Sequence, residues 1–336
     1  MGEFDLIARF FQRPAHRAAG HVALGVGDDC ALLQPAPGTQ LAISCDMLVE
    51  GRHFLPDVDS ATLGHKALAV NLSDLAACGA KPLAFTLALA LPRADEAWLA
   101  GFARGLFALA DAHGCELIGG DTTQGPLNIC ITVFGEVPAV NGRSQALLRS
   151  GARPGDDLYV SGMPGQARLA LEALQGQRNL PADVLPALRQ RLEQPTPRVA
   201  LGLALRGVAS AAIDVSDGLL GDLGHILKAS ACGATINTSD AINSIAADAD
   251  ITRPEAQFLM QLPLEQQQAL VLAGGDDYEL LFSAPPTARA AVQAAARASD
   301  TPVTRIGSIE TTPGLRLVDA QGQPVSGRFA SFDHFA

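Results

Sequence analysis

The sequence predicts an α/β fold, or α+β in a looser sense, built as two domains. Its 336 residues suffice for two domains of ordinary size, and its 48% hydrophobic content can supply their cores. Apolar segments of period two alternate with longer segments of helical period. A stretch rich in Gly, Ser and Arg, residues 138–154, lacks both periods. We therefore expect an N-terminal domain over residues 1–138 and a C-terminal α/β domain over residues 150–336.

The first half begins with an amphipathic helix at residues 4–11 and a strand, turn and strand at residues 22–33. The helix expected at residues 61–78 is apolar nearly all round, which indicates burial, and Gly79 follows it as a stop. The other elements expected here are strands at residues 41–46, 83–91, 115–118 and 128–137 and a helix at residues 94–113.

The second half repeats the alternation. A Gly-rich turn at residues 161–165 opens a helix, and it suits either a bound phosphate or a simple helix cap. Residues 237–268 are polar and predict surface helices. The other expected elements are strands at residues 157–160, 211–216, 278–282, 303–309 and 315–318, and helices at residues 166–174, 218–230 and 286–299, with a short one within 176–198.

Composition excludes several classes of protein. The net charge of −11 without a basic patch argues against nucleic acid, and the longest apolar run, residues 83–91, is too short to span a membrane. The acidic N-terminus lacks the apolar region of a signal peptide. Six Cys without C-x-x-C spacing predict buried free thiols in a reducing cytoplasm rather than a zinc site or disulfides.

Acidic residues recur at Gly-rich turns and at expected strand ends. Asp46 and Asp121 each follow an apolar strand, where α/β folds gather ligands. Each alone suits a solvated turn, but the repetition favours bound cations. The positions concerned are Asp28, Asp29, Asp46, Asp121, Asp214, Asp217, Asp276 and Asp277.

The neighbours of Asp214 and Asp217 give further support to the prediction of bound cations. Strand alternation places Asp214 and Ser216 on one face, while Asp217 is expected to cap the helix that follows. A further acid, Asp74, shares a face of the buried helix with Asn71 and has no Lys or Arg within helical reach. A buried carboxylate needs a partner, and we favour a cation over a helix cap or a distant Arg.

So many carboxylates would repel ATP unless metal ions intervene. Mg²⁺ uses one or two carboxylates together with substrate phosphates, so the pattern favours phosphoryl transfer assisted by several Mg²⁺ ions. The common ATP motifs are missing: none of Lys66, Lys81 and Lys228 follows Gly as in a Walker A loop, and no protein-kinase His-Arg-Asp loop occurs.

Seven motifs, in order along nearly the whole chain, resemble those of the thiamine-monophosphate kinase family. They are Gly27-Asp28-Asp29-Cys30-Ala31, Ser44-Cys45-Asp46, Gly51-x-His53-Phe54, Asn71-Leu72-Ser73-Asp74-Leu75-Ala76, Gly119-Gly120-Asp121-Thr122, Asp214-Val215-Ser216-Asp217-Gly218-Leu219 and Gly274-Gly275-x-Asp277-Tyr278-Glu279-Leu280. The resemblance implies ATP-dependent conversion of thiamine monophosphate to thiamine diphosphate with several Mg²⁺. It also implies a two-domain fold like aminoimidazole ribonucleotide synthetase, with mixed sheets flanked by helices, and a homodimer joined through N-terminal strands.

The same resemblance assigns site residues. It implies substrate contacts at His53, Asp276 and Phe332, and no general base or covalent nucleophile. Family members often have Thr at position 45, so Cys45 could contribute only its carbonyl, and they often have Glu at position 276. The implied metal ligands are Asp29, Ser44, Cys45, Asp46, Asp74, Asp121, Asp214 and Asp217, and the implied ATP contacts are Gly120, Asp121, Arg149 and Ser216.

Two alternative functions stay open at this point. A selenophosphate synthetase would carry a reactive Cys or selenocysteine near a Lys close to the N-terminus, whereas the first Cys here is Cys30 and the first Lys is Lys66. A non-catalytic protein that binds Mg²⁺ and nucleotide would keep the acids without turnover.

Overall fold

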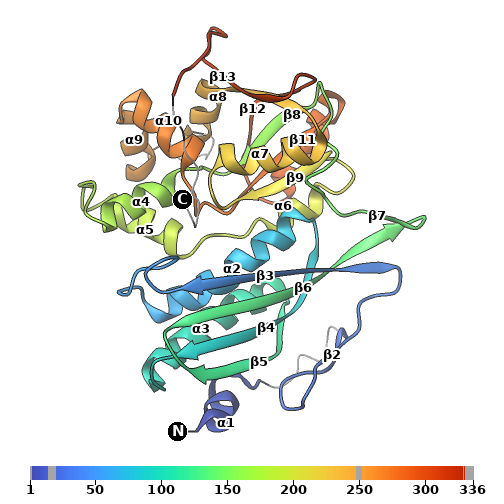
Figure 1. Cartoon of the computed structure of the whole chain (residues 1–336), viewed down its shortest axis with the longest axis vertical. Coiled ribbons are helices and arrows are strands. Elements are labelled where there is room, and N and C mark those ends of the chain that lie inside the picture. The colour runs from blue at the N-terminus through green and yellow to red at the C-terminus, as the bar shows by residue number, and fades with distance from the viewer. Residues whose placement is uncertain (1, 14–19, 247–251, 328, 330–336) are drawn as a thin grey trace. The chain divides into compact units, whose positions relative to one another are not determined.

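The computed structural model describes residues 2–13, 20–246, 252–327 and 329. It divides into two compact units, one of residues 1–75 and 80–145 and the other of residues 76–79 and 146–336 (Figure 1). Each unit contains one main sheet flanked by helices, so the chain has the α/β architecture expected from the alternation of its periods.

The N-terminal unit is built on a sheet with the strand order β3-β6-β4-β5. The strand β6 pairs antiparallel with β3 and β4, whereas β4 pairs parallel with β5, so the sheet is mixed. The helices α2 and α3 lie against one face of it (Figure 1). The elements are α1 (Glu3–Leu6), a π-helix (Ile7–Phe11), β1 (Val22–Leu24), β2 (Leu32–Leu33), β3 (Thr39–Val49), α2 (Ser60–Ala77), β4 (Lys81–Leu91), α3 (Glu96–His113), β5 (Glu116–Gln124), β6 (Asn128–Val140) and β7 (Arg143–Ser144).

The two long helices pack at close range because glycines face each other's backbone. A Cβ at Gly64 of α2 would collide with the carbonyl of Phe102, and one at Gly105 of α3 would collide with the carbonyl of Ala61. The interior of α2 is buried nearly all round, as its sequence predicted.

Two predicted strand ends are wrong. The strand β5 continues through Gly119, Gly120 and Asp121 instead of stopping before them, and Asp46 lies inside the 11-residue β3. Strand length is set by the pairing partner: β3 stays paired with β6 along its whole length. The Gly-Gly step follows an irregularity in the β4–β5 register, and Gly120 has a φ of 147° where a Cβ would strike the carbonyl of Leu87.

The C-terminal unit is built on a six-stranded sheet with the order β13-β10-β12-β8-β11-β9. Its elements are β8 (Asp157–Ser161), α4 (Gln166–Leu174), α5 (Leu185–Glu193), α6 (Val199–Ala204), β9 (Ala211–Val215), α7 (Leu219–Ser230), β10 (Gly233–Asn237), α8 (Thr238–Asn243), a 3₁₀ turn (Ser244–Ala246), α9 (Pro254–Gln261), α10 (Leu264–Ala273), β11 (Glu279–Ala284), a 3₁₀ turn (Pro286–Ala288), α11 (Arg289–Ala298), β12 (Val303–Glu310) and β13 (Gly314–Val318).

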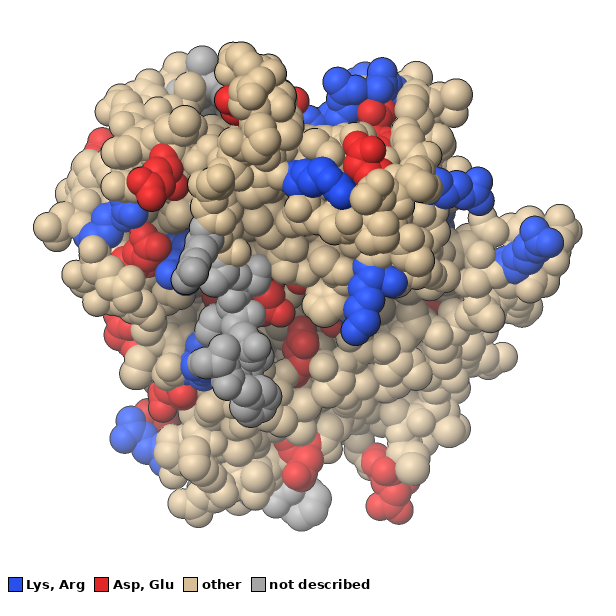
Figure 2. Space-filling model, turned by 45° about the horizontal axis from the view of Figure 1, so that its top comes forward, with Lys and Arg blue, Asp and Glu red and all other residues tan. Residues whose placement is uncertain are grey.

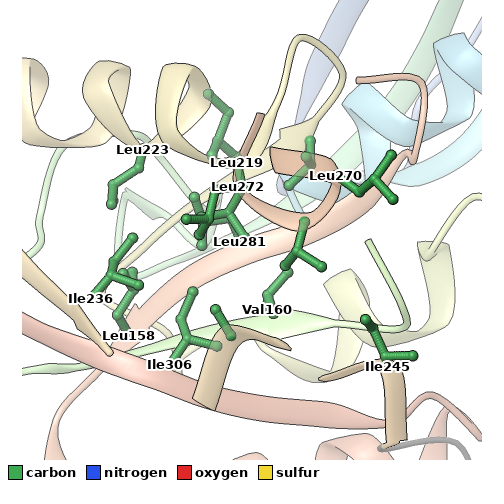
Figure 3. Packing of buried hydrophobic residues seen from close by; sticks show 14 of the residues in the cluster. Leu158, Val160, Leu219, Leu223, Ile236, Ile245, Leu270, Leu272, Leu281 and Ile306 are labelled. Carbon is green, nitrogen blue, oxygen red and sulfur yellow. The ribbon is translucent and has the colours of Figure 1, made fainter. Parts of the chain in front are cut away.

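The core of this unit lies between its sheet and the helices α7 and α10. Leu158 and Val160 of β8 and Leu281 of β11 meet Leu219 of α7 and Leu270 of α10 in one buried cluster (Figure 3). α10 begins inside the segment expected to form polar surface helices, residues 237–268, and its residues 270–272 are buried. Two further elements, β10 and α6, were not predicted, because they are too short to show a clear period.

The prediction that the cysteines are buried is wrong for four of the six. Cys115 and Cys232 are buried, but Cys78 and Cys130 are partly exposed and Cys30 and Cys45 are exposed. The apolar run of β3 misled the prediction, because Leu41, Ile43, Cys45 and Met47 alternate onto a face that the structure leaves uncovered. All six thiols are free of disulfides.

A pH-dependent contribution to stability is expected from Asp157 on β8. Arg289 donates from Nε at 2.6 Å and Nη2 at 2.8 Å, and Arg305 donates at 3.2 Å. The hydrogen bonds from Arg289 hold the pKa of Asp157 below its usual value. A carboxyl whose pKa is lowered by folding stabilises the fold above its unfolded pKa of about 3.9, and this stabilisation disappears as the pH falls through the lower, folded value.

We therefore expect Asp157→Asn to lower the melting temperature at pH 7 by about 2–4 °C. Scanning calorimetry from pH 7 to pH 2.5 should show wild type and variant converging in the acid range, because the wild-type carboxyl becomes neutral there. A difference that stays constant with pH would show that the charge of Asp157 does not stabilise the fold.

Candidate functional site

A cavity of about 820 Å³ in the N-terminal unit joins two of the acidic motifs. Its lining includes Asp28 and Asp29 from the loop after β1, and Gly120 and Asp121 from β5. Residues 7, 8, 11 and 12 of the N-terminal helical segment line it as well. Asp29 and Asp121 are both exposed, so the cavity offers carboxylate oxygens and a glycine backbone to a ligand of nucleotide size.

A second group of predicted site residues forms where β3 meets α2. The Ser44 hydroxyl donates to Asp74 Oδ2 at 2.5 Å, and the backbone N–H of Asp46 donates to Asn71 Oδ1 at 3.0 Å. Alternation along β3 turns Ser44 and Asp46 toward α2, while Cys45 points to the other face, where its sulfur lies 3.4 Å from that of Cys130. The shared helix face of Asn71 and Asp74 is thus confirmed.

His53 is held in place by its neighbours in the turn after β3. Its Nδ1 accepts the backbone N–H of Val49 at 3.0 Å, and its carbonyl accepts Lys66 Nζ at 3.2 Å. A ring nitrogen that accepts carries no proton, so the neutral His53 carries its proton on Nε2. Lys66 is itself buried, and sequence reasoning gave it no role.

In the C-terminal unit, Asp214 is the last residue but one of β9, and Ser216 and Asp217 follow the strand in a loop. The prediction that Asp217 caps the next helix is wrong. The carboxylate of Asp222, one turn into α7, accepts the backbone N–H groups of Ser216, Asp217 and Gly218 with one oxygen, each at 3.1 Å. Burial and the nearby Asp217 raise the pKa of Asp222 to about 6, although these N–H groups oppose the shift.

A second loop, residues 274–278, runs beside the first. The N–H of Asp276 donates to the carbonyl of Ser216, and the N–H of Tyr278 donates to the carbonyl of Val215, both at 2.8 Å. Asp276 has a φ of 64°, in the left-handed region, and its Oδ1 accepts the Tyr278 hydroxyl at 3.2 Å. The loop that bears Asp214 and Asp217 is therefore fixed along its backbone.

The Gly-rich turn at residues 161–165 holds no open anion site, because an internal carboxylate occupies the start of α4. Asp277 accepts the N–H of Gly165 at 2.7 Å and that of Ala167 at 3.4 Å. Burial raises the pKa of Asp277 to about 8. Of the two open interpretations of this turn, the geometry favours the helix cap, supplied by a residue 112 positions away from Gly165.

A buried ionic cluster centred on Glu279 lies next to the Gly-rich turn at residues 161–165. The carboxylate accepts from Arg198 Nε at 2.7 Å and Nη2 at 2.5 Å, from Arg191 Nη2 at 2.8 Å and from Ser161 Oγ at 2.6 Å. Burial acts to raise the pKa of Glu279, but the charge and hydrogen bonds of Arg198, helped by Arg191, outweigh it and leave the pKa lowered.

Two predicted residues remain, Arg149 and Phe332. Arg149 is exposed, and its carbonyl accepts the Ser230 hydroxyl at 3.0 Å. Phe332 falls outside the described residues. Within the residues that the structure describes, no three His, Cys, Asp or Glu side chains come together as a preformed metal centre, and no helix is long and apolar enough to cross a membrane. Figure 2 shows acidic and basic side chains scattered over one face of the molecule.

Both halves of the chain match family models. Residues 27–137 match the N-terminal domain of AIR synthase related proteins, and residues 153–320 match the C-terminal domain. The thiamine-monophosphate kinase of Salmonella typhimurium is 47% identical over 339 residues, covering 100% of this chain and 98% of the relative. That of Escherichia coli is 46% identical over 340 residues with the same coverage.

The chain also matches solved structures of thiamine-monophosphate kinases. A thiamine-monophosphate kinase from Stenotrophomonas maltophilia matches with a TM-score of 0.79 and 43% identity, covering 96% of each chain. AaThiL complexed with AMPPCP and TMP matches with a TM-score of 0.73 and 27% identity, covering 99% of this chain and 97% of the other. The hydrogenase maturation protein HypE, at 21% identity and a TM-score of 0.71, shares the fold.

Proposed function

The chain belongs to the thiamine-monophosphate kinase family, and on that premise we propose that it passes the γ-phosphoryl group of ATP directly, in line, to thiamine monophosphate with the help of several Mg²⁺ ions. It is a phosphotransferase that converts thiamine monophosphate to thiamine diphosphate. The observation that carries the proposal is the cavity that joins Asp29, Gly120 and Asp121 in a chain 47% identical to such a kinase.

The donor atoms of the acidic motifs fit Mg²⁺. They are carboxylate and hydroxyl oxygens, which this hard cation prefers, and Mg²⁺ would neutralise the phosphate charges that develop in the transfer. The proposed set is Asp29, Ser44, Asp46, Asp74, Asp121, Asp214 and Asp217, with the carbonyl of Cys45.

The residues proposed to bind the two substrates are of two kinds. Gly120, Asp121, Arg149 and Ser216 would contact ATP, and the place of Gly120 and Asp121 in the lining of the cavity supports this. His53, Asp276 and Phe332 would contact thiamine monophosphate, where the Nε2–H of His53 is a suitable donor. The AMPPCP and TMP bound to AaThiL support this choice of substrates.

The proposed reaction needs no proton transfer from the acceptor to the protein. The acceptor is a phosphate oxygen that is already anionic near neutral pH, because the second pKa of a phosphate monoester is about 6. The chain therefore needs to hold donor and acceptor in line and to keep water out, and no general base is required. The Asp residues proposed as metal ligands are not needed as nucleophiles.

The stereochemical course tests the direct route. With ATP made chiral at the γ-phosphorus, a single transfer inverts the configuration in the thiamine diphosphate formed. Retention of configuration, or labelled protein trapped with ATP alone, would show that one of the carboxylates forms a phosphoenzyme.

The two alternatives predict other products. A selenophosphate synthetase would use selenide as acceptor, and a binding protein would leave ATP intact. The identity to named thiamine-monophosphate kinases favours the kinase over both. We also propose the cytoplasm as the compartment, which the six free thiols support.

We further propose that the enzyme is a homodimer joined through β3. This strand is an edge of its sheet and exposes Leu41 (44%), Ile43 (60%) and Met47 (53%) on one face. An edge strand of 11 residues presents unpaired backbone N–H and C=O groups to another chain, and this one also exposes apolar side chains. A second copy of the chain could cover both through a symmetric interface.

Ile43→Asp is therefore expected to turn the dimer into a monomer, because a charge would be buried at the interface. Light scattering after size exclusion measures the mass directly. Leu264→Asp is the matched control, since Leu264 of α10 is equally exposed at 62% but lies in the other unit. A monomeric wild type, or an Ile43→Asp variant that stays dimeric, would contradict the proposal.

A further inference from the structure

The loop between β9 and α7 has the shape of an anion site, but a residue of the chain already fills it. Three consecutive N–H groups, those of Ser216, Asp217 and Gly218, converge on Asp222 Oδ2 at 3.1 Å each. Such a nest of backbone donors binds phosphate in other proteins. Asp222 is only 3% exposed, so its carboxylate excludes a ligand phosphate from these donors.

The carbonyl side of the same loop is also occupied. Val215 and Ser216 accept the N–H groups of Tyr278 and Asp276, and a Cβ at Gly275 would press on the Ser216 carbonyl. With these backbone groups occupied, we expect the loop to meet a ligand mainly through side chains. Ser216 and Asp217 are the partly exposed ones.

We propose that Asp222 is a positioning residue of the kinase: by accepting these three N–H groups it fixes the directions of Ser216 and Asp217 and keeps a ligand phosphate away from the three backbone donors. The inference rests on the proposed function, because it assumes that this loop meets Mg²⁺ and nucleotide. Residues that hold metal ligands from behind typically change metal affinity by about 10- to 100-fold when removed.

The test separates hydrogen-bond geometry from charge. Asp222→Ala removes both, Asp222→Asn keeps an acceptor oxygen at the same distance without charge, and Asp222→Glu keeps the charge but moves the acceptor by one methylene. Glu255→Gln is the control, because Glu255 is also a buried acid in the first turn of a helix, α9, and has no place in the proposed site. Binding of Mn²⁺ in the presence of AMPPCP is followed by electron paramagnetic resonance, alongside KM for ATP and for thiamine monophosphate.

We expect Asp222→Ala to weaken Mn²⁺ binding and raise KM for ATP by about 10-fold or more, while KM for thiamine monophosphate stays within about 2-fold. Asp222→Asn should recover most of the loss, and Asp222→Glu should not. If Asp222→Ala does not fold, the order Asn better than Glu still decides the matter.

Several results would overturn the inference. They are unchanged Mn²⁺ binding in Asp222→Ala, equal loss in the Asn and Glu variants, better binding in Glu than in Asn, or a matching loss in Glu255→Gln. If the wild-type chain itself shows no Mn²⁺-dependent binding of AMPPCP, the proposed function fails as well. Normal wild-type binding with insensitive Asp222 variants overturns the positioning role alone.

Discussion

Replacing Asp74 with Asn is expected to lower kcat/KM about 10²- to 10³-fold, the usual cost of losing one group that stabilises charge in a transition state. Asp74 lies on the face of α2 that meets β3, where it accepts the Ser44 hydroxyl at 2.5 Å. Asn also offers an acceptor oxygen, so this contact can persist. The loss should therefore appear in turnover, with the melting temperature changed by less than about 2 °C.

The control for this variant is Asp59→Asn at the start of the same helix. Asp59 Oδ1 accepts the N–H groups of Ala61 and Thr62, and Asn serves such a position as well as Asp does. Steady-state kinetics and thermal melts on both variants separate a site defect from a helix defect. Activity of Asp74→Asn within about threefold of wild type would remove Asp74 from the proposed metal ligands.

The largest expected effect on stability comes from Glu279→Gln, which should reduce the free energy of unfolding by about 3–5 kcal/mol, the cost of removing one partner from a buried ion pair. Glu279 is fully buried, and the change leaves the Arg198 and Arg191 guanidiniums without their counter-charge. Denaturant unfolding followed by far-ultraviolet circular dichroism measures the change, since the single Trp lies in the N-terminal unit.

Glu172→Gln gives the comparison. Glu172 also binds two arginines, Arg168 at 3.0 Å and Arg178 at 3.1 Å, but its own side chain is 18% exposed, whereas that of Glu279 is 0% exposed. Exposed ion pairs contribute less than about 1 kcal/mol, so this variant should be nearly neutral. Equal losses in the two variants would show that burial does not govern the Glu279 cluster.

Local patterns were sufficient for most of the fold. Period and stop signals predicted α2 and α3, with the left-handed Gly114 ending α3, because these features act within a few residues. Strand ends were less predictable: Asp46 and Asp121 lie inside strands because the partner strands continue beside them. That information comes from residues far away in the sequence.

The sequence drew attention to the acids of the candidate site, but it did not reveal the contacts that these acids make. The repetition of acids drew attention to Asp29, Asp74, Asp121 and Asp214. The sequence could not distinguish acids that would bind a metal ion from acids that stabilise the fold through internal contacts. Asp277 caps a helix 112 positions away, and Glu279 pairs with Arg198 81 positions away. The contact between Asp222 and the loop is local, since Asp222 lies only four residues after Gly218. The sequence could therefore have indicated Asp222 as an acceptor for the backbone N–H groups of this loop.

We expect ATP to donate its γ-phosphoryl group to thiamine monophosphate in a reaction that needs Mg²⁺. The most direct measurement incubates the purified protein with thiamine monophosphate, Mg²⁺ and ATP labelled in the γ-phosphoryl group, then separates the products. We expect labelled thiamine diphosphate and ADP in equal amounts, none of either with excess EDTA, and recovery when Mg²⁺ is restored. ADP without labelled thiamine diphosphate, or transfer that continues in excess EDTA, would contradict the account.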